Sequence, residues 1–371
     1  MTEKVYDGLE GVLAGESAIC DVDHDTGGLL YRGYRIEDLA EQASFEEVAY
    51  LLLNGALPNR RALSEFQKEL AAARTVPDHL GRFLKSLPPS SNPMDVLRSA
   101  VSLLGLEDPD REANDHPANL RKAIRLIAQM PTLLAAFGRN GELPPFDPAL
   151  SHAEHLLALL TGSRPDPFSA KVMNVSLILY AEHEFNASTF AARVTASSLS
   201  DIHSAVTSAI GSLKGPLHGG ANEAVMKMLL TVGSVENADR YIRDRLARKE
   251  RIMGFGHRVL KRGDSRSDII KRYAKALGER KGDEKWFSLS NRIETIMREE
   301  KDLYPNLDFY SASAYYLMGL PISFDTPLFV CSRISGWSAH VMEQHDHNRL
   351  IRPRCKYTGP RGLTYLPIEK R

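Results

Sequence analysis

The sequence has few cysteines, no excess of either charge and no long apolar run, and each absence excludes a class of protein. Its three cysteines, Cys20, Cys331 and Cys355, have no CxxC spacing, so neither a disulfide framework nor a zinc site is expected. The 47 basic residues balance the 47 acidic ones, so no overall charge attracts nucleic acid or an anionic membrane. No apolar run approaches the roughly 20 residues of a membrane helix, and residues 1–12 lack the apolar core of a signal peptide. These absences predict a cytoplasmic protein.

The chain also lacks the short motifs of several enzyme classes. It has no GxGxxG fingerprint, no Walker loop and no GxSxG nucleophile elbow, which argues against a dinucleotide-binding enzyme, a P-loop protein and a Ser/His/Asp hydrolase. The chain is long enough for a sizeable core, since 371 residues with 43% apolar side chains suffice for two domains or one large domain.

Helical periodicity covers most of the chain after a short β-prone opening. Pieces at 17–22 and 29–32 flank the turn signal at 25–28 and predict a small hairpin that holds most of the strand content. Ser44, with Glu47 three residues later, predicts a capping box. The fold class is therefore mainly α, and the tail after Cys355 is predicted to be an extended arm. Helices are predicted at 37–43, 44–53, 59–71, 94–104, 120–137 (interrupted or kinked at Pro131), 151–160, 223–230, 237–252, 267–277, 286–299 and 311–317.

Two polar stretches of the sequence are predicted to be exposed to solvent. Residues 106–117 are rich in acidic side chains, and we expect an exposed connection there. His152 and His155 stand at i, i+3 in a predicted helix, a spacing that would suit a metal, but no acidic or cysteine ligand is set beside them. We therefore expect a pair on the helix surface, and no metal site is predicted.

The first stretch with catalytic features is 214–223, which carries His218 between a Gly-Pro step and a Gly-Gly pair. Pro216 fixes its own φ and the glycines permit positive φ, so this loop can bend sharply. Asn222 is expected to cap the next helix, whose positive end would then lie beside His218 and steady negative charge on an oxygen. The alternative is an ordinary turn with a chance histidine.

A second glycine-flanked histidine and one carboxylate extend this pattern. His257 follows Gly254-Phe255-Gly256, and Asp308 stands among apolar and aromatic neighbours at 304–311. Burial would raise the pKa of Asp308 and strengthen it as a base. Two such histidines and a desolvated carboxylate are the ingredients of acid–base chemistry at a carbonyl centre, while the alternative for Asp308 is a helix cap.

On these segments the chain resembles the citrate synthase family, which includes 2-methylcitrate synthases. The matching segments, GPLHGGANE, MGFGHRV, PNLDFYS, YAEHEFNAST, SRISGW and NRLIRPR, span most of residues 8–360 in family order. The resemblance implies a Claisen-type condensation of an acyl-CoA with oxaloacetate. It makes Asp308 the base, His218 the donor to the enolate oxygen, and His257 the group on the ketone.

The resemblance also implies the residues that bind the two substrates. Oxaloacetate would be held by His183, Arg266, Arg333 and Arg352. Arg352 would reach into the partner subunit's site, which implies a homodimer with shared active sites. Arg258 and Lys261 would contact coenzyme A, which is a substrate, and no cofactor is implied. Two departures from the family pattern, Ser265 and Asp325, have no assigned role.

The same resemblance implies a citrate-synthase-like, two-domain helical fold. Residues 1–219 and 320–371 would form a large domain and 220–319 a small one, which closes over oxaloacetate around a hinge at His218. The sequence begins too close to the predicted hairpin for the additional N-terminal domain of the larger, NADH-regulated hexameric forms, so we expect a dimer without that regulation.

The function expected first is citrate synthase, at the entry of the tricarboxylic acid cycle. The nearest alternative is 2-methylcitrate synthase, which would use propionyl-CoA with the same catalytic residues, because one methylene in an apolar pocket discriminates only about 10–200-fold. One enzyme with both activities is a further option. From another class, the chain could be a catalytically silent helical binding protein, although Asp308, His218 and His257 are all in place.

Overall fold

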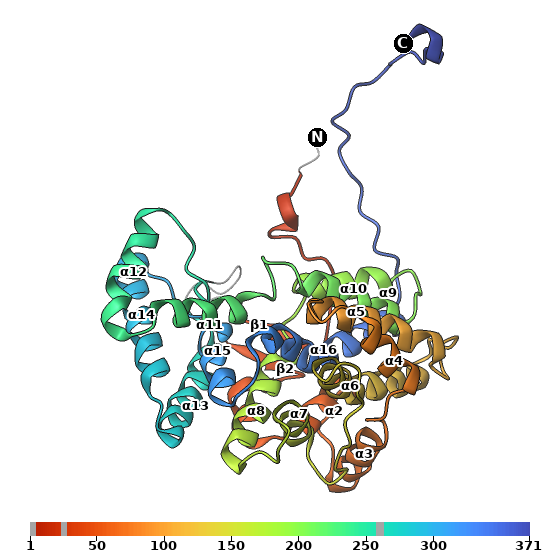
Figure 1. Ribbon diagram of the computed structural model, residues 1–371. Helices are drawn as coiled ribbons and strands as arrows, with labels where there is room; N and C mark the ends of the chain where they lie inside the picture. Colours follow the sequence, from red (N-terminus) through yellow and green to blue (C-terminus); the bar gives the residue numbers. More distant parts are fainter. Residues whose placement is uncertain (1–4, 24–27, 257–262) are drawn as a thin grey trace.

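The computed structural model describes residues 5–23, 28–256 and 263–371, and this part of the chain is mainly α-helical, as predicted (Figure 1). Sixteen α-helices follow one antiparallel sheet of β1 (Cys20–Val22), β2 (Leu29–Tyr31) and β3 (Tyr34–Arg35) within the described ranges. The pairing of β1 with β2 confirms the predicted hairpin, although most of its turn signal lies outside the described residues. β3 is only two residues long, too short for a periodic pattern to indicate it.

Most helices form one body around the last long helix, α16 (Asp325–Asp346). This helix lies at the centre of Figure 1 and contacts α2, α5, α6, α8, α9, α10 and α11. It is buried on nearly every side, which is why its sequence shows no polar face. The other helices of the body are α1 (Ile36–Gln42), α2 (Phe45–Asn54), α3 (Arg60–Ala72), α4 (Asp78–Ser86), α5 (Pro93–Glu107), α6 (His116–Gly138), α7 (His152–Thr161), α8 (Pro167–Tyr180), α9 (Ala187–Ala196) and α10 (Ile202–Leu213).

Five helices gather beside this body, at the left of Figure 1. Within the group, α15 packs against α11 and α13, and α12 packs against α14. The group meets the main body where α13 contacts α8 and where α11 contacts α16. Its members are α11 (Ala221–Val232), α12 (Val235–Ala247), α13 (Ser265–Lys281), α14 (Lys285–Lys301) and α15 (Leu307–Leu317).

Local capping explains where several helices begin. Ser44 and Glu47 form the predicted capping box of α2, and Gly55 ends that helix in the left-handed conformation. α4 was not predicted, because its start has no capping side chain: Pro77 stands at the N-cap position. α6 continues through Pro131, so the predicted interruption there is wrong.

The histidine pair of α7 lies in the interior, so the expectation of a surface pair is wrong. His152 and His155 are each about 1% exposed. The reason is tertiary, because α7 packs between α6 and α8, and the two imidazoles meet the rings of Phe45 and Phe146. Desolvation lowers the pKa of His155 to about 3, which keeps it neutral and makes its burial tolerable.

The acidic connection before α6 is largely exposed, as predicted, with Asp108 as the buried exception. Asp108 is buried, and Arg125 of α6 donates two hydrogen bonds to its carboxylate at 2.7 and 2.9 Å. Arg125 also reaches Asp110 at 2.7 Å. A buried carboxylate needs such a partner, and the sequence pattern alone did not reveal that α6 supplies it.

The hairpin is fixed to the body by one buried tyrosine of β2. The hydroxyl of Tyr31 accepts a hydrogen bond from the N–H of Glu182 at 3.1 Å and lies 2.9 Å from the carbonyl oxygen of the same residue. It also lies 3.1 Å from the carbonyl oxygen of Ile178 in the last turn of α8. The hairpin therefore holds the loop that follows α8.

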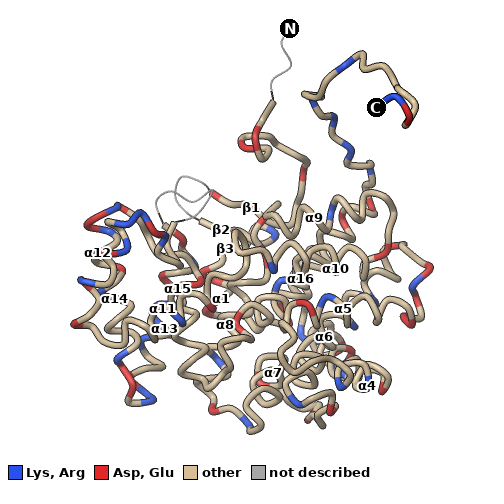
Figure 2. The backbone as a smooth tube through the Cα atoms, turned by 45° about the horizontal axis from the view of Figure 1, so that its top comes forward, with Lys and Arg blue, Asp and Glu red and all other residues tan. Residues whose placement is uncertain are grey.

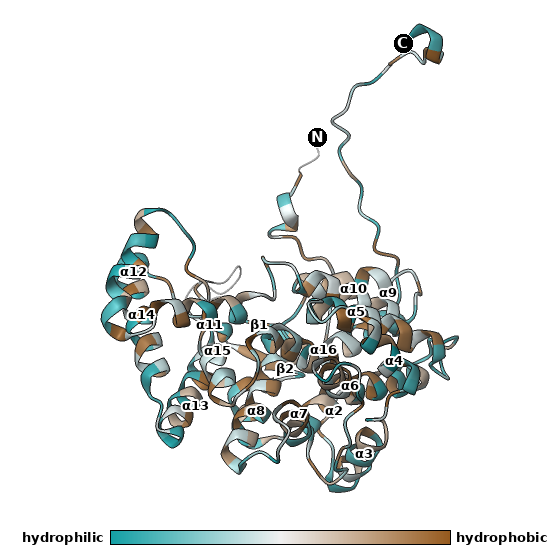
Figure 3. Ribbon diagram, viewed as in Figure 1, coloured by the Kyte–Doolittle hydropathy of each residue, from teal (hydrophilic) through white to brown (hydrophobic). Residues whose placement is uncertain are grey.

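Acidic and basic residues are both frequent on the outer helices, most densely on α12 and α14 (Figure 2). Apolar residues occur along all the helices (Figure 3), and many of them are buried in the core. None of the helices in the described ranges has the length and apolar character to cross a membrane. After α16 the chain leaves the body as the predicted extended arm, which is largely exposed from Arg352 onward and lies on the same side as the N-terminal segment (Figure 1).

Candidate active site

His218 lies on the loop between α10 and α11, half-buried, with its imidazole against the start of α9. The backbone N–H of Ser188 donates to Nε2 at 3.2 Å, and Ser188 Oγ lies 2.8 Å from the same nitrogen. An amide N–H can only donate, so Nε2 accepts and the proton of the neutral ring is assigned to Nδ1. Desolvation, with the nearby Arg333, lowers the pKa of His218 to about 4. His218 is therefore a neutral hydrogen-bond donor at neutral pH.

The expected cap of the helix after His218 is not formed as predicted. α11 begins at Ala221 with Gly220 at its N-cap, and no side chain caps it. Asn222 lies inside the first turn, fully buried, and its Nδ2 donates to the carbonyl oxygen of Asp325 at 3.3 Å. Because the glycine begins the helix two residues earlier than expected, Asn222 instead ties α11 to the start of α16.

Asp308 lies in the first turn of α15. Asn306 is the N-cap, and its side chain accepts from the N–H of Asp308 at 3.1 Å, so Asp308 is not a cap. The hydroxyl of Tyr180 donates to Asp308 Oδ1 at 2.5 Å. Desolvation raises the pKa of Asp308 to about 6, and the bond from Tyr180 and the charge of Arg266 oppose that rise. The carboxylate is thus a stronger base than a solvated aspartate.

The residues just before His257 lie beside the start of α15. Phe255 forms an isolated β-bridge with Pro305, and the N–H of Asn306 donates to the carbonyl oxygen of Gly254 at 2.9 Å. Gly254 has φ +83°, and a Cβ there would lie 2.7 Å from the ring of Phe309, so this close approach requires glycine. His257 itself lies outside the described residues, as do Arg258 and Lys261.

Two site residues, Tyr180 and Phe329, were not singled out from the sequence. The Phe329 ring lies edge-on to Tyr180 at 4.6 Å and to His218 at 6.3 Å between centroids. The guanidinium of Arg333 lies 4.7 Å from the same centroid. Phe329 is thus a shared ring contact of Tyr180, His218 and the predicted anion-binding Arg333. Its spacing of i, i+4 from Arg333 on one helix was the available signal.

The structure buries two of the three arginines predicted to bind oxaloacetate, Arg333 on α16 and Arg266 on α13. Arg333 is about 1% exposed, and its Nε donates to the carbonyl oxygen of Tyr180 at 2.7 Å. Desolvation lowers its pKa, and the negative charge of Glu182 opposes this. Arg266 donates two hydrogen bonds to Asp264, the N-cap of α13, at 2.9 and 2.8 Å. Both guanidinium groups are therefore held in place before any anion binds.

The two remaining predicted residues within the described ranges differ in burial. His183 is buried in the loop between α8 and α9, three residues after Tyr180. Arg352 lies exposed at the beginning of the C-terminal arm, outside the cluster of a single chain. Of the two departures, the Ser265 hydroxyl is buried at the start of α13, and Asp325 is buried at the start of α16, where desolvation raises its pKa to about 8.

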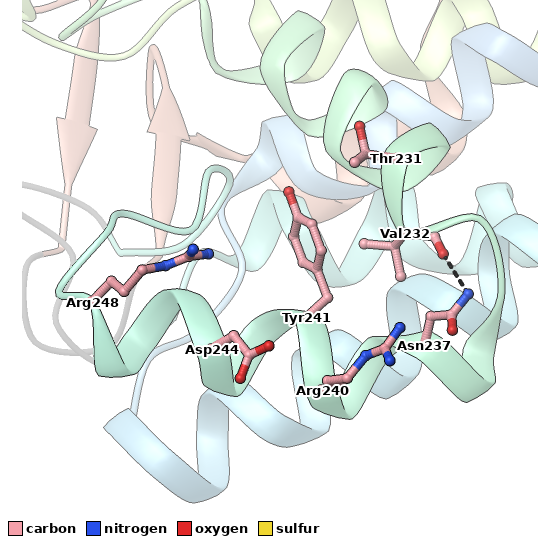
Figure 4. Close-up of a pocket in the computed structure, with 7 residues that line it drawn as sticks. All are labelled: Thr231, Val232, Asn237, Arg240, Tyr241, Asp244 and Arg248. Atoms are coloured by element: carbon pink, nitrogen blue, oxygen red, sulfur yellow. Dashed lines mark hydrogen bonds between the residues drawn. The ribbon is translucent and has the colours of Figure 1, made fainter.

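A surface pocket of about 290 Å³ lies elsewhere, between the end of α11 and α12 (Figure 4). It contains none of the residues discussed above. Its lining residues are Thr231, Val232, Asn237, Arg240, Tyr241, Asp244 and Arg248. Among the described residues, no group of three or more His, Cys, Asp or Glu side chains is arranged to hold a metal ion.

Comparison with known proteins places this geometry in a family. Residues 8–354 match the family model described as citrate synthase, C-terminal domain. The chain is 51% identical to citrate synthase 2 of Bacillus subtilis over 98% of each chain, and 45% identical to 2-methylcitrate synthase of Shewanella oneidensis over 98% of this chain and 97% of that one.

Solved structures of citrate synthases are also similar to this chain. A citrate synthase of Thermoplasma acidophilum, solved as a ternary complex with carboxymethyl coenzyme A and oxaloacetate, superposes with a TM-score of 0.94 at 33% identity over 100% of both chains. A citrate synthase of Pyrobaculum aerophilum gives a TM-score of 0.92 at 38% identity over 99% of this chain and 95% of that one. The chain therefore belongs to the citrate synthase family of transferase-type condensing enzymes.

Proposed function

We propose that this enzyme is a citrate synthase, which condenses acetyl-CoA with oxaloacetate to give citrate and free coenzyme A. The observation that carries the proposal is that a neutral donor, His218, and a carboxylate of raised pKa, Asp308, are linked through two rings. His218 meets the ring of Phe329, and Phe329 meets Tyr180, whose hydroxyl donates to Asp308. The donor and the carboxylate are the two groups that enolisation of a thioester requires. The solved Thermoplasma relative holds oxaloacetate and a coenzyme A derivative, which supports the same substrate classes here.

In this mechanism Asp308 removes a proton from the methyl carbon of acetyl-CoA. His218 donates its Nδ1–H to the thioester oxygen as negative charge develops there. A neutral imidazole suits this role because its N–H is a weak acid, as the enol is. The enol carbon then attacks the ketone carbon of oxaloacetate, whose oxygen takes a proton from His257. Water hydrolyses the resulting citryl thioester and releases the thiol of coenzyme A.

In this proposal, buried arginine side chains bind the carboxylates of oxaloacetate. We assign its carboxylates to Arg333, Arg266 and Arg352, with His183 as a hydrogen-bonding partner, and the coenzyme A contacts to Arg258 and Lys261. Arg333 and Arg266 are each buried and fixed by a hydrogen bond or an ion pair, so little ordering entropy is left to lose on binding. Coenzyme A is a substrate, and the proposed reaction needs no further cofactor.

We propose a cytoplasmic homodimer whose two active sites are shared. Arg352 is exposed at the root of an arm that leaves its own body, a placement that suits a residue completing the partner's site. Each chain would consist of a large domain (1–219 and 320–371) and a small one (220–319), which carries Asp308 and His257. Closure of the small domain would bring the base to the oxaloacetate site and exclude water.

The rival function is 2-methylcitrate synthase, and relatives with that name are 43–47% identical to this chain. The decisive experiment measures kcat/KM for acetyl-CoA and propionyl-CoA side by side, with oxaloacetate saturating and thiol release monitored. We expect acetyl-CoA to be preferred by about 10-fold or more, the scale on which a pocket discriminates one methylene. A preference for propionyl-CoA would assign the rival function. Turnover of neither would refute a condensing activity.

The raised pKa of Asp308 predicts a pH dependence. The base works only when ionised, so kcat/KM should fall as the pH drops through about 6. Tyr180→Phe removes the hydroxyl that stabilises the ionised form, so the pKa of Asp308 should rise and the acidic limb should move to higher pH. The matched control, Tyr315→Phe, removes a buried hydroxyl bonded to Ser176 instead, and its limb should not move. An unmoved limb in Tyr180→Phe would show that Asp308 is not the titrating base.

Sharing of sites can be tested by complementation. Arg352→Ala and His218→Ala should each be nearly inactive as homodimers. Subunits of the two variants, denatured, mixed and refolded together, should regain about a quarter of wild-type activity, because half of the dimers are mixed and one of their two sites is intact. Activity that stays at the level of the separate variants would contradict a shared site.

A further inference from the structure

A chain of polar contacts, fully buried at Glu182 and His340, runs from the loop after α8 across α16 to the residues before the hairpin. Nε2 of His340 lies 2.9 Å from Glu182 Oε1, and both side chains are fully buried. Arg193 donates to Nδ1 of His340 at 2.8 Å and to Glu343 at 2.7 Å. Glu343 in turn accepts from the backbone N–H of Ala18, just before the hairpin, at 2.9 Å.

The partners of His340 fix its tautomer. A guanidinium can only donate, so Nδ1 of His340 accepts from Arg193 and the neutral ring carries its proton on Nε2. That proton is donated to the Glu182 carboxylate. The other oxygen, Oε2, makes no hydrogen bond to any described part of the chain. Within the described residues, the hydrogen bond from His340 therefore orients this carboxylate. A buried carboxylate that lost this bond would be strongly penalised.

Glu182 is held on its other sides as well. Its backbone N–H and carbonyl oxygen both meet the hydroxyl of Tyr31. On the opposite side lies Gly336 of α16, where an added Cβ would stand 2.1 Å from Glu182 Oε2 and 2.3 Å from the carbonyl oxygen of Ala181. The residue that follows Glu182 is His183.

We propose that Glu182 and His340 are positioning residues for oxaloacetate binding. Their hydrogen bond fixes the backbone of the loop between α8 and α9, so that His183 faces oxaloacetate in one conformation beside Arg333. This inference rests on the proposed function, because it assumes that oxaloacetate is the ligand of His183. Neither side chain touches the reacting atoms, and their effect passes through the loop.

Two amide variants of His340 test the hydrogen bond to Glu182 separately from the contact with Arg193. The amide of glutamine in His340→Gln reaches about as far as Nε2, so it can still donate to Glu182. The shorter amide in His340→Asn reaches about as far as Nδ1, so it keeps the contact with Arg193 and loses the one with Glu182. We expect His340→Gln to bind oxaloacetate within about threefold of wild type, and His340→Asn to raise both the Kd by calorimetry and the KM by about tenfold, since small misplacements of binding groups are costly.

The control for general destabilisation is His203→Asn. His203 is also buried, lies 3.6 Å from the carboxylate of Asp108 and belongs to the far end of α10 from His218. It should lower the thermal midpoint without changing the Kd for oxaloacetate. Equal oxaloacetate affinity in His340→Gln and His340→Asn would overturn the proposal, as would an equal loss of affinity in His203→Asn.

Gly336→Ala perturbs the same carboxylate from another residue of α16. It therefore tests the proposal even where a His340 variant does not fold. The added methyl group must displace Glu182 or Ala181, and we expect the affinity for oxaloacetate to fall by about tenfold or more. A folded Gly336→Ala protein with wild-type affinity would also overturn the proposal. Failure of the proposed function is distinguished by the wild type itself, which would then neither bind oxaloacetate nor release thiol.

Discussion

The site depends on the contact between one face of α16 and the segment 180–188, which runs from the last residue of α8 through the connecting loop into the first turn of α9. Arg333, Trp337 and His340 stand at i, i+4 and i+7 on α16, and each donates to this segment, at the Tyr180 carbonyl oxygen, Ser188 Oγ and Glu182. The same segment contacts the proposed acid–base groups. Its Tyr180 hydroxyl donates to Asp308 on α15, and its Ser188 N–H donates to His218 before α11. One interior helix thus sets the positions of groups from both parts of the fold.

Burial then gives these groups the protonation states that the proposed chemistry needs. The same desolvation lowers the pKa of His218 and raises that of Asp308, so a neutral donor and a strengthened base coexist near neutral pH. Leaving Arg333 and Arg266 buried without counter-charges would be costly, and Glu182 and Asp264 offset that cost. A dianion such as oxaloacetate would enter a region whose positive charges are already fixed.

How far the sequence predicts this structure depends on whether a feature is local. The hairpin, the capping box at Ser44 and most helices follow from periodicity and capping residues, and the glycines around His218 and the apolar neighbours of Asp308 indicated both groups. The bond from Tyr180 to Asp308 spans 128 residues of sequence, and no local pattern encodes it. The burial of His152 likewise depends on packing by α6 and α8. The role proposed for Arg352 would depend on a second chain, which no pattern in one sequence can reveal.

The measurement that tests the central claim most directly is thiol release from acetyl-CoA with oxaloacetate by Asp308→Asn. This change keeps the size of the side chain and an acceptor for Tyr180 but removes the base. We expect a rate at least about a hundredfold below wild type, the lower end for loss of a general base, with an unchanged thermal midpoint. Asp325→Asn, which alters a second buried carboxyl group, should keep most of the activity. An Asp308→Asn enzyme that turns over near the wild-type rate would contradict the account.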